Sequence, residues 1–485
     1  MTLVPDNFYL TTTLPYVNAE PHIGFALEIV AADVIARYHR LMGEQVVFNT
    51  GTDEHGQKIY QQAQAAHQNP QAYCDEYAVK FSSLKTQLNL SYSHFIRTTD
   101  SHHITAAQEF WRRCSAKGDI YKKAYKTKYC VGCELEKTDS ELLDGRCPLH
   151  PNKDLEVREE ENYFFRFSKY QTALLSHYEQ HPEFVLPSFR LKEIKSFVAG
   201  GLQDFSISRL KAKMPWGIGV PGDENHVMYV WFDALINYIS TLGWPENSEN
   251  FQQYWPGIQL AGKDNLRQQS AMWQAMLLSA SLPPSKQILI NGFISVNGQK
   301  MSKSLGNVIS PAELVTRYSL DGARFLLMNL GPFGEDMDVS FGRLDQEYTA
   351  YLANGLGNLC SRVARLAEKH GLGVADWARG ELTLRQPAKP QAEFVTAMEH
   401  YELSTALSWL KQQITIVDQH LSETKPWLQT DVVQAKKDLT IAIQQIIIVV
   451  WQLQPFMPEI SEKILNHFRS EQITALTPLF PRLEN

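Results

Sequence analysis

Hydrophobic and polar positions along the first 115 residues follow a strand–helix–strand pattern. Alternation predicts a strand at residues 8–13, a periodic apolar face predicts a helix at 25–42 that ends at Gly43, and a second strand follows at 45–49. Such units build doubly wound parallel sheets, whose ligands lie beyond the carboxyl ends of the strands. We therefore expect an α/β fold with a doubly wound, Rossmann-like parallel sheet.

The pattern changes twice further along the chain. Short, polar, turn-rich segments run from about residue 120 to about residue 169, which is typical of an insertion. Alternating α/β character returns at 229–238, 258–264 and 287–295. Beyond residue 344 helical patterns take over, at 344–369, 392–421, 432–453 and 459–468, with a loop rich in Pro and Arg near 384–390. These changes predict four parts: the first half of an α/β catalytic domain (1–118), a connective insert (119–225), the second half of that domain (226–343) and an all-α carboxyl-terminal domain (344–485).

Composition restricts the class of protein but does not indicate a ligand. A chain of 485 residues is too long for one core, and 44% hydrophobic with 20% charged residues is typical of a globular enzyme. The net charge of -7 gives no overall positive field, so any RNA-binding surface must be local. The amino terminus lacks the features of a signal peptide, and the apolar run at 441–451 is too short to cross a membrane. We expect a cytoplasmic protein with a buried helix there and no membrane partner.

Half of the six cysteines gather in the predicted insert. Cys130 and Cys133 form one Cys-x-x-Cys pair, and Cys147 and His150 follow as a Cys-x-x-His pair after thirteen intervening residues. This spacing is typical of a zinc knuckle, in which four ligands close a tetrahedral site and leave no position for substrate. The alternative is two coincidental pairs of ordinary residues. The spacing favours one structural Zn²⁺ per chain in a reducing compartment.

Two segments carry candidate phosphate chemistry. The string Lys-Met-Ser-Lys-Ser at 300–304 concentrates the charges of Lys300 and Lys303, which suits the charge that develops as pyrophosphate leaves. Near the amino terminus, His22 and Gly24 lie just before a helix predicted to begin at Phe25, where free N–H groups attract phosphate. Taken singly, the first could be a solvated basic turn, and the histidine could be a helix cap or a core residue.

Together the two segments resemble the paired "HIGH" and "KMSKS" elements of the class I aminoacyl-tRNA synthetases, except that Phe25 stands where that family usually has histidine. The segments at 14–18, 51–56, 229–234 and 262–264 are similar to segments of methionyl-tRNA synthetases, in the same order. This resemblance covers nearly the whole chain. It implies ATP-dependent activation of L-methionine and transfer to tRNA(Met), with Mg²⁺ bound to ATP.

The resemblance also implies roles for individual residues. His22, Lys300 and Lys303 would be catalytic, and Asp53 would hold the α-ammonium group of methionine. The implied ATP-binding residues are Gly24, Phe25, Gly262, Asp264, Lys300 and Lys303. The implied methionine site, whose aromatic rings suit a thioether, consists of Leu14, Tyr16, Asp53, Trp231, Ala234, Tyr238, Gln269 and Trp273. Gln268, Gln269 and Asn291 are further departures, because the family commonly has histidine at two of these places.

The helical part carries one more match. Asn358 and Arg362 are four residues apart and so share a helix face, and Trp427 follows the next long helix. In the resembled family the corresponding residues read the tRNA anticodon, with the tryptophan stacked on an unpaired base. For Trp427 alone, packing in the core is the alternative.

Two rival functions stay open at this stage. One is another class I synthetase for an apolar amino acid, such as leucine, isoleucine, valine or cysteine. The insert is short for the editing domain of the first three enzymes, and a cysteine enzyme usually coordinates zinc at the substrate. The other is a catalytically silent paralogue that only binds tRNA or a partner, although the intact lysine string speaks against it. The chain ends soon after the predicted helical domain, so we expect a monomer.

Overall fold

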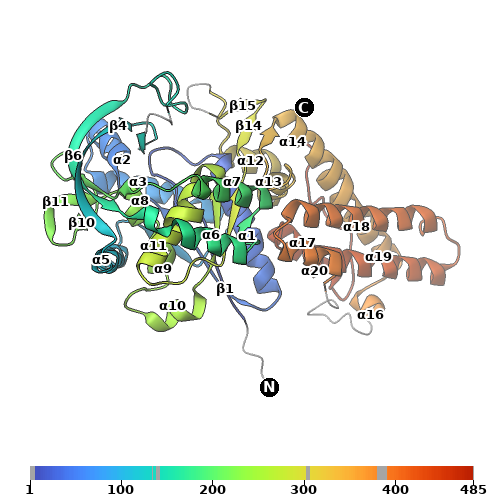
Figure 1. Ribbon diagram of the computed structural model, residues 1–485. Helices are drawn as coiled ribbons and strands as arrows, with labels where there is room; N and C mark the ends of the chain where they lie inside the picture. The colour runs from blue at the N-terminus through green and yellow to red at the C-terminus, as the bar shows by residue number, and fades with distance from the viewer. Residues whose placement is uncertain (1–5, 134, 138–141, 302–305, 379–389, 484–485) are drawn as a thin grey trace.

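The computed structural model describes residues 6–133, 135–137, 142–301, 306–378 and 390–483, with an α/β unit beside a set of helices (Figure 1). Six strands form one sheet in the order β3-β2-β1-β12-β13-β7, and every pair of neighbours is parallel. The strands are β1 (Asn7–Thr11), β2 (Gln45–Thr52), β3 (His94–Arg97), β7 (Val185–Leu186), β12 (Ile258–Gly262) and β13 (Gln287–Asn291). The predicted doubly wound α/β fold is confirmed.

Helices connect and cover these strands. They are α1 (Ile23–Leu41), α2 (Gln57–Ala65), α3 (Pro70–Ser82), α4 (Leu84–Gln87), α5 (Ser101–Ala116), α8 (Val230–Ala234), α9 (Asn237–Ser240), α10 (Ser248–Tyr254) and α11 (Trp273–Ser279). The helix predicted to begin at Phe25 begins at Ile23 instead, because the His22 side chain accepts the Gly24 N–H and caps the helix two residues earlier. A π-helical turn, η4 (Gln268–Met272), leads into α11.

The part predicted as an insert is built around a long antiparallel ribbon. Strands β4 (Ile120–Cys130) and β6 (Glu156–Phe165) pair from Ile120↔Phe165 to Tyr129↔Glu156. The other elements of this part are β5 (Leu135–Lys137), α6 (Gln171–Gln180), α7 (Ser188–Ala199), β8 (Phe205–Ser206), β9 (Ser208–Leu210), β10 (Gly219–Val220) and β11 (Asp223–Met228). One strand from the same range, β7, joins the edge of the main sheet beside β13.

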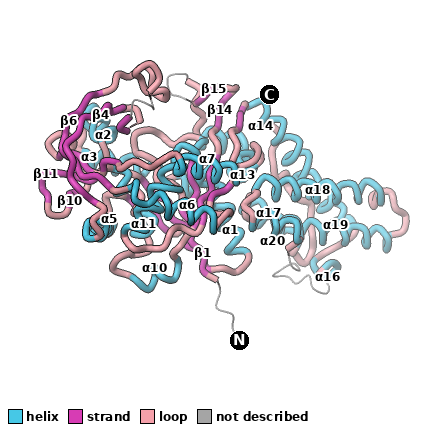
Figure 2. The backbone as a smooth tube through the Cα atoms, in the orientation of Figure 1, coloured by secondary structure: helices cyan, strands magenta, loops and turns pink. Residues whose placement is uncertain are grey.

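After β13 the chain builds a small sheet with two helices and then becomes helical. The elements of the first part are β14 (Ile294–Val296), β15 (Gln299–Lys300), α12 (Pro311–Tyr318), α13 (Leu320–Met328) and β16 (Met337–Val339). The helical part consists of α14 (Phe341–Glu347), η6 (Tyr348–Gly357), α15 (Asn358–Lys369), α16 (Val374–Trp377), α17 (Ala392–Glu399), α18 (Leu403–Thr424), α19 (Val432–Leu453) and α20 (Pro458–Phe468). Figure 2 shows no strand among the helices α17 to α20.

The helical predictions agree with the structure with two exceptions. The helix predicted at 344–369 comprises the end of α14, the π-helical η6 and α15, with a kink at Gly355. The bounds of α19 match the predicted 432–453, and its apolar stretch is buried, as expected of a core helix. The helix predicted at 392–421 is two helices, because Tyr401 has a φ of 58°, which ends α17 before α18 begins. The predicted loop at 384–390 lies outside the described residues except for its last one. Among the described residues, no helix is both long enough and apolar enough to cross a membrane.

A fully buried arginine ties the sheet to the helices of the carboxyl-terminal part. Arg324 on α13 donates to the carbonyl oxygens of Leu88, Pro455 and Phe456 at 2.9–3.0 Å. The same guanidinium lies 2.8 Å from a carboxylate oxygen of Asp33 on α1, which is also fully buried. The apolar core continues across this junction, from the sheet and α1 into α18 and α19.

Candidate active site and metal centre

Loops that follow β1 and β2 meet at the carboxyl ends of these two strands. Asp53 comes directly after β2 and is 4% exposed. Its N–H donates to the carbonyl of Pro15 at 3.0 Å, and its carbonyl accepts the Val17 N–H at 3.3 Å. This short parallel bridge places Tyr16 beside Asp53. Two predicted methionine-site residues from separate segments are thereby held side by side by backbone hydrogen bonds, with Leu14 half-buried in the same loop.

The start of α1 meets the segment that carries Lys300. A side-chain carbon placed on Gly24 would lie 3.7 Å from the Met301 methyl group, and the Ile23 N–H donates to the Ile309 carbonyl at 3.1 Å. The same carbon would collide with the His22 ring, so Gly24 is needed where it stands. Burial lowers the pKa of His22, which keeps the ring neutral at pH 7.

The lysine string is described only in part. Lys300 ends β15 and is exposed, whereas Lys303 falls in 302–305, outside the described residues. Gly262 ends β12, and Asp264 follows it. Burial raises the pKa of Asp264, and the charge of Lys300 acts against this shift, so the two side chains lie within electrostatic reach of each other. The ends of β1, β2 and β12 and the start of α1 therefore surround one site.

Glu28 on α1 belongs to this site, although the motifs did not single it out. The carboxylate is 5% exposed and accepts hydrogen bonds from the Thr13 N–H at 2.8 Å and the Thr13 hydroxyl at 2.6 Å. Burial, with a smaller contribution from the charge of Asp264, raises its pKa to about 7 against the hydrogen bonds from Thr13. The signal in the sequence is a single carboxylate in an otherwise apolar stretch of helix, 23–32.

One wall of the site consists of buried polar and aromatic side chains from α9, η4 and α11. The Gln269 amide donates to the Tyr238 hydroxyl at 2.6 Å, and the Tyr238 ring lies 5.9 Å from the Trp273 ring. All three side chains are almost fully buried. On α8, Trp231 and Ala234 are half-buried, and the Trp231 ring lies 5.9 Å from that of Tyr229.

A pair of residues inside the segments 51–56 and 229–234, to which the resemblance gave no individual role, links the two sides of the site. His55 follows Asp53 in the loop before α2, and its Nδ1 lies 3.1 Å from a carboxylate oxygen of Asp233 on α8. Both side chains are buried, and the His55 ring packs edge-on against Trp216. This contact fixes α8 relative to the loop that carries Asp53.

Phe25 and Asn291, two of the positions that depart from the resembled family, lie in different parts of the structure. Phe25 is half-buried and packs edge-on against Phe81 of α3, with ring centres 5.5 Å apart. Asn291 ends β13, is buried, and its amide donates to the Gly292 carbonyl at 3.0 Å. Phe25 therefore has a hydrophobic partner of its own on α3, which is a contact a histidine would make less well.

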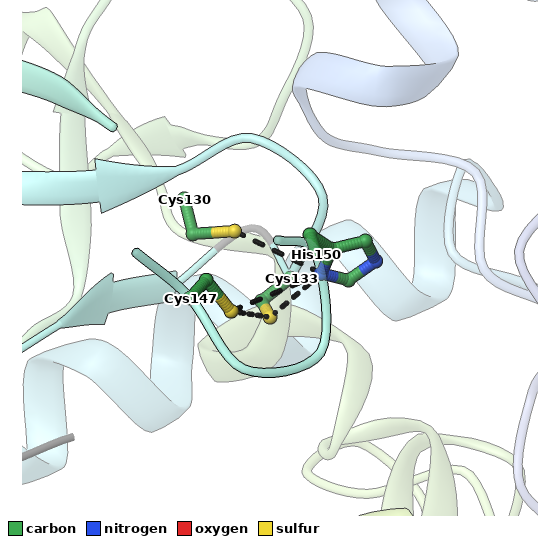
Figure 3. Close-up of side chains that lie close together, drawn as sticks. All are labelled: Cys130, Cys133, Cys147 and His150. Carbon is green, nitrogen blue, oxygen red and sulfur yellow. Dashed lines mark hydrogen bonds between the residues drawn. The ribbon is translucent and has the colours of Figure 1, made fainter. Parts of the chain in front are cut away.

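The four predicted metal ligands converge at the end of β4 (Figure 3). The ligand atoms of Cys130, Cys133, Cys147 and His150 all lie within 4.8 Å of one another. Cys133 Sγ is 3.3 Å from Cys147 Sγ and 3.2 Å from His150 Nδ1, and Cys130 Sγ is 3.8 Å from that nitrogen. These separations exceed a disulfide bond of about 2.05 Å. They fit tetrahedral ligands, since two sulfurs at about 2.3 Å from one ion lie about 3.8 Å apart.

The backbone leaves room for this cluster. A side-chain carbon on Gly132 would overlap the ring of His150, so position 132, just before Cys133, requires glycine. Cys130 and Cys147 are buried and Cys133 is half-buried. The residues present can hold a metal ion with three sulfurs and one nitrogen.

The three predicted anticodon residues lie on the helical part. Asn358 begins α15 and is exposed, and Arg362 lies one turn later on the same helix. The Arg362 guanidinium lies 5.5 Å from the centre of the Trp427 ring and donates to Asp418 at 2.7 Å. Trp427 keeps 38% of its surface exposed, more than a core tryptophan would.

Comparison with known proteins gives one consistent result. Residues 8–154 and 138–364 match the family described as tRNA synthetases class I (M). The methionine–tRNA ligase of Thermosynechococcus vestitus is 43% identical, over 94% of this chain and 89% of that protein. The corresponding ligase of Thermotoga maritima is 40% identical, over 96% of this chain and 76% of that protein.

A solved structure agrees with these sequence matches. The structure of Mycobacterium tuberculosis methionyl-tRNA synthetase in complex with methionyl-adenylate is 34% identical, with a TM-score of 0.89. The match covers 98% of this chain and all of that one, including both the α/β unit and the helices. Since these relatives match over 76% to 100% of their own length, the chain belongs to the methionine–tRNA ligases of the class I tRNA synthetases.

Proposed function

We propose that this chain activates L-methionine with ATP to form methionyl-adenylate and then transfers the methionyl group to tRNA(Met). The observation that carries the proposal is the meeting of two segments far apart in sequence. Gly24 at the start of α1 lies against Met301, beside the carboxyl ends of parallel strands where ligands of such sheets bind.

In the first step the methionine carboxylate attacks the α-phosphorus of ATP, and pyrophosphate leaves. Asp53 holds the α-ammonium group, so that the carboxylate is positioned for in-line attack. Because Nδ1 of His22 accepts the Gly24 N–H, the neutral ring carries its proton on Nε2, which can donate to a phosphate oxygen. Lys300 and Lys303 add positive charge for the leaving pyrophosphate. Mg²⁺ bound to ATP supplies further charge neutralisation on the phosphates.

In the second step a hydroxyl of the terminal tRNA ribose attacks the carbonyl carbon of the adenylate. The bond to AMP breaks, AMP leaves with its phosphate oxygen, and an ester to the tRNA forms. The helical part would hold the anticodon at the same time, with Trp427 stacked on an unpaired base.

Amino-acid-dependent exchange of pyrophosphate into ATP tests the first step. With each of the twenty amino acids supplied in turn, we expect exchange with methionine and far less with the others. No exchange with any amino acid would indicate a silent tRNA-binding paralogue. Exchange with another apolar amino acid instead of methionine would show that this other amino acid is the substrate. The monomeric state and the cytoplasmic location stay predictions. Light scattering, which gives the molar mass in solution, tests the first of them.

We further propose that the ion held by the cysteine and histidine cluster is structural Zn²⁺, because four protein ligands leave no open position. Protein washed with a weak chelator should retain one zinc per chain, and Cys133→Ser should lose it with disorder of the knuckle. Cys74→Ser changes a buried cysteine away from the cluster and should keep the metal. Zinc-free wild-type protein with an unchanged circular dichroism spectrum would contradict the assignment.

Trp427→Ala should weaken tRNA charging and spare pyrophosphate exchange. The exposed ring, held by the Arg362 guanidinium, offers one base stack, which is worth about 1–3 kcal/mol. We therefore expect the Michaelis constant for tRNA to rise about 5- to 150-fold. Trp427→Phe keeps an aromatic face and should recover most of the loss. If charging and exchange fall together, Trp427 instead supports the fold.

A further inference from the structure

The short strand β15, which ends at Lys300, is joined to β14 by a two-residue turn. Asn297 and Gly298 form this turn with φ angles of 52° and 72°. Positive φ at both positions is typical of a type I′ hairpin, for which Asn-Gly is a favoured pair. The turn sets the register of the hairpin, in which Ser295 pairs with Lys300. The direction in which β15 leaves the turn therefore decides where Lys300 lies.

The carboxylate of Asp338 on β16 holds this turn from the other side of β14. Its Oδ1 accepts the Gly298 N–H at 2.7 Å and the Ser295 hydroxyl at 2.7 Å. Both donors belong to the hairpin, one in the turn and one on β14. The hydrogen bonds from Ser295 and Gly298 hold the pKa of Asp338 below its usual value. The group is therefore charged at neutral pH, and both hydrogen bonds are charge-assisted.

Asp338, Ser295 and Lys300 lie in one row across the small sheet. Strand β14 pairs with β16 through Ser295↔Asp338 and with β15 through Ser295↔Lys300. Directly paired residues have their side chains on the same face of a sheet, so these three side chains share a face. Neighbouring strands are about 4.8 Å apart, which places the backbone of Asp338 about 10 Å from that of Lys300. Asp338 therefore acts on Lys300 through the hairpin between them.

Both ends of this arrangement are fixed to the rest of the fold. The backbone carbonyl of Asp338 accepts the Arg343 guanidinium at 3.1 Å, and the same guanidinium donates to the Leu330 carbonyl at 2.8 Å. At the other end, Met301 follows β15 and lies against Gly24, where α1 begins. The hairpin thus reaches from an anchored carboxylate to the start of α1.

We propose that Asp338 is a positioning residue for the first step: it holds the β14–β15 hairpin so that Lys300 reaches the pyrophosphate that leaves ATP. The inference rests on the proposed function. Such a role is limited to adenylate formation, because pyrophosphate has already left when the tRNA hydroxyl attacks. A misplacement of about 1 Å can lower a rate about 100-fold, so a small tilt of the hairpin is enough to matter.

The test compares the two steps in Asp338→Ala. In a single turnover with ATP and methionine saturating, we expect adenylate formation to slow about 10-fold, because the turn loses both hydrogen bonds. Transfer of the methionyl group from isolated enzyme-bound adenylate to tRNA should keep the wild-type rate, and the Michaelis constant for methionine should not change. Asp338→Asn keeps an acceptor oxygen and should recover most of the loss. Asp6→Ala, the same change at an exposed position before β1, should behave as the wild type.

A double variant locates the effect. Lys300→Ala removes the charge that Asp338 positions, so adding Asp338→Ala to it should slow adenylate formation little further. Additive losses would overturn the inference, because the two residues would then act independently.

The other outcomes are equally distinct. Equal slowing of both steps in Asp338→Ala would mean that the residue only supports the fold, and unchanged adenylate formation would mean that the turn needs no such support. Either result would overturn the inference. Should Asp338→Ala not fold, Ser295→Ala removes one of the two hydrogen bonds and gives the same comparison with a smaller loss. If the proposed function fails instead, wild-type protein will show no methionine-dependent exchange at all.

Discussion

Asp53→Asn is expected to raise the Michaelis constant for methionine about 30-fold or more in pyrophosphate exchange. The variant keeps the shape of the side chain and removes the charge that, under the proposed function, pairs with the α-ammonium group of methionine. Truncating one partner of a buried charge pair costs about 2–5 kcal/mol, mostly because the other charge stays unpaired. The backbone of residue 53 is fixed by its two hydrogen bonds to the loop after β1, so the local fold should survive.

The constants to compare are those for methionine and ATP, each measured with the other substrate saturating. The Michaelis constant for ATP should change little, because the proposed site for the phosphates lies at the start of α1 and not at Asp53. Asp6→Asn makes the same change at an exposed position before β1 and should behave as the wild type. An unchanged constant for methionine in Asp53→Asn would place the ammonium group elsewhere.

The second large effect concerns stability. Arg324→Met should lower the free energy of unfolding by about 3–5 kcal/mol, because it leaves three carbonyl oxygens and one carboxylate buried with fewer donors. The loss would appear as a lower urea midpoint, followed by circular dichroism and by tryptophan fluorescence. Arg365→Met replaces an arginine on the exposed face of α15 and should shift the midpoint little. Equal midpoints for the two variants would show that the buried ion pair adds nothing to stability.

The same pair predicts a dependence on pH. Burial alone would raise the pKa of Asp33, but the charges of Arg324 and Arg37, together with hydrogen bonds from Ser91, outweigh it and hold the pKa below its usual value. A carboxylate with a lowered folded-state pKa contributes stability that is complete above its unfolded pKa of about 4. That contribution is lost as the pH falls below about 4 through the folded-state value. In Arg324→Met the acid-induced part of the loss should be smaller.

Much of this structure follows from local sequence. The periodic apolar face of α19 predicts both of its ends, and the spacing of the cysteine and histidine pairs predicts the cluster at the end of β4. The motif strings also predict which segments meet, because ligands of parallel sheets bind where strands end. The structure places Tyr16 beside Asp53 and Gly24 against Met301.

Other features depend on partners that no local pattern specifies. Strand β7 has two residues, too few for an alternation to be visible. Arg324, Asp33 and His55 look like ordinary polar residues in sequence, and only the packing of distant helices gives each its charged partner. In sequence, Gln269 only differs from the histidine that is common at this place in the resembled family. The structure shows that its amide donates a hydrogen bond to the Tyr238 hydroxyl. In each case the missing information is which of many possible distant groups lies within hydrogen-bonding reach.

The strand order has a consequence for the folding of the chain during its synthesis on the ribosome. Strand β1 lies between β2 and β12, and roughly 250 residues separate the end of β1 from the start of β12. Because the ribosome adds about 5–20 residues per second, one edge of β1 stays unpaired for roughly 12 to 50 seconds until β12 has been synthesised. Such an edge is open to pairing with other chains. A nascent chain released before residue 262 therefore carries Asp53 and His22 but can close neither the sheet nor the site.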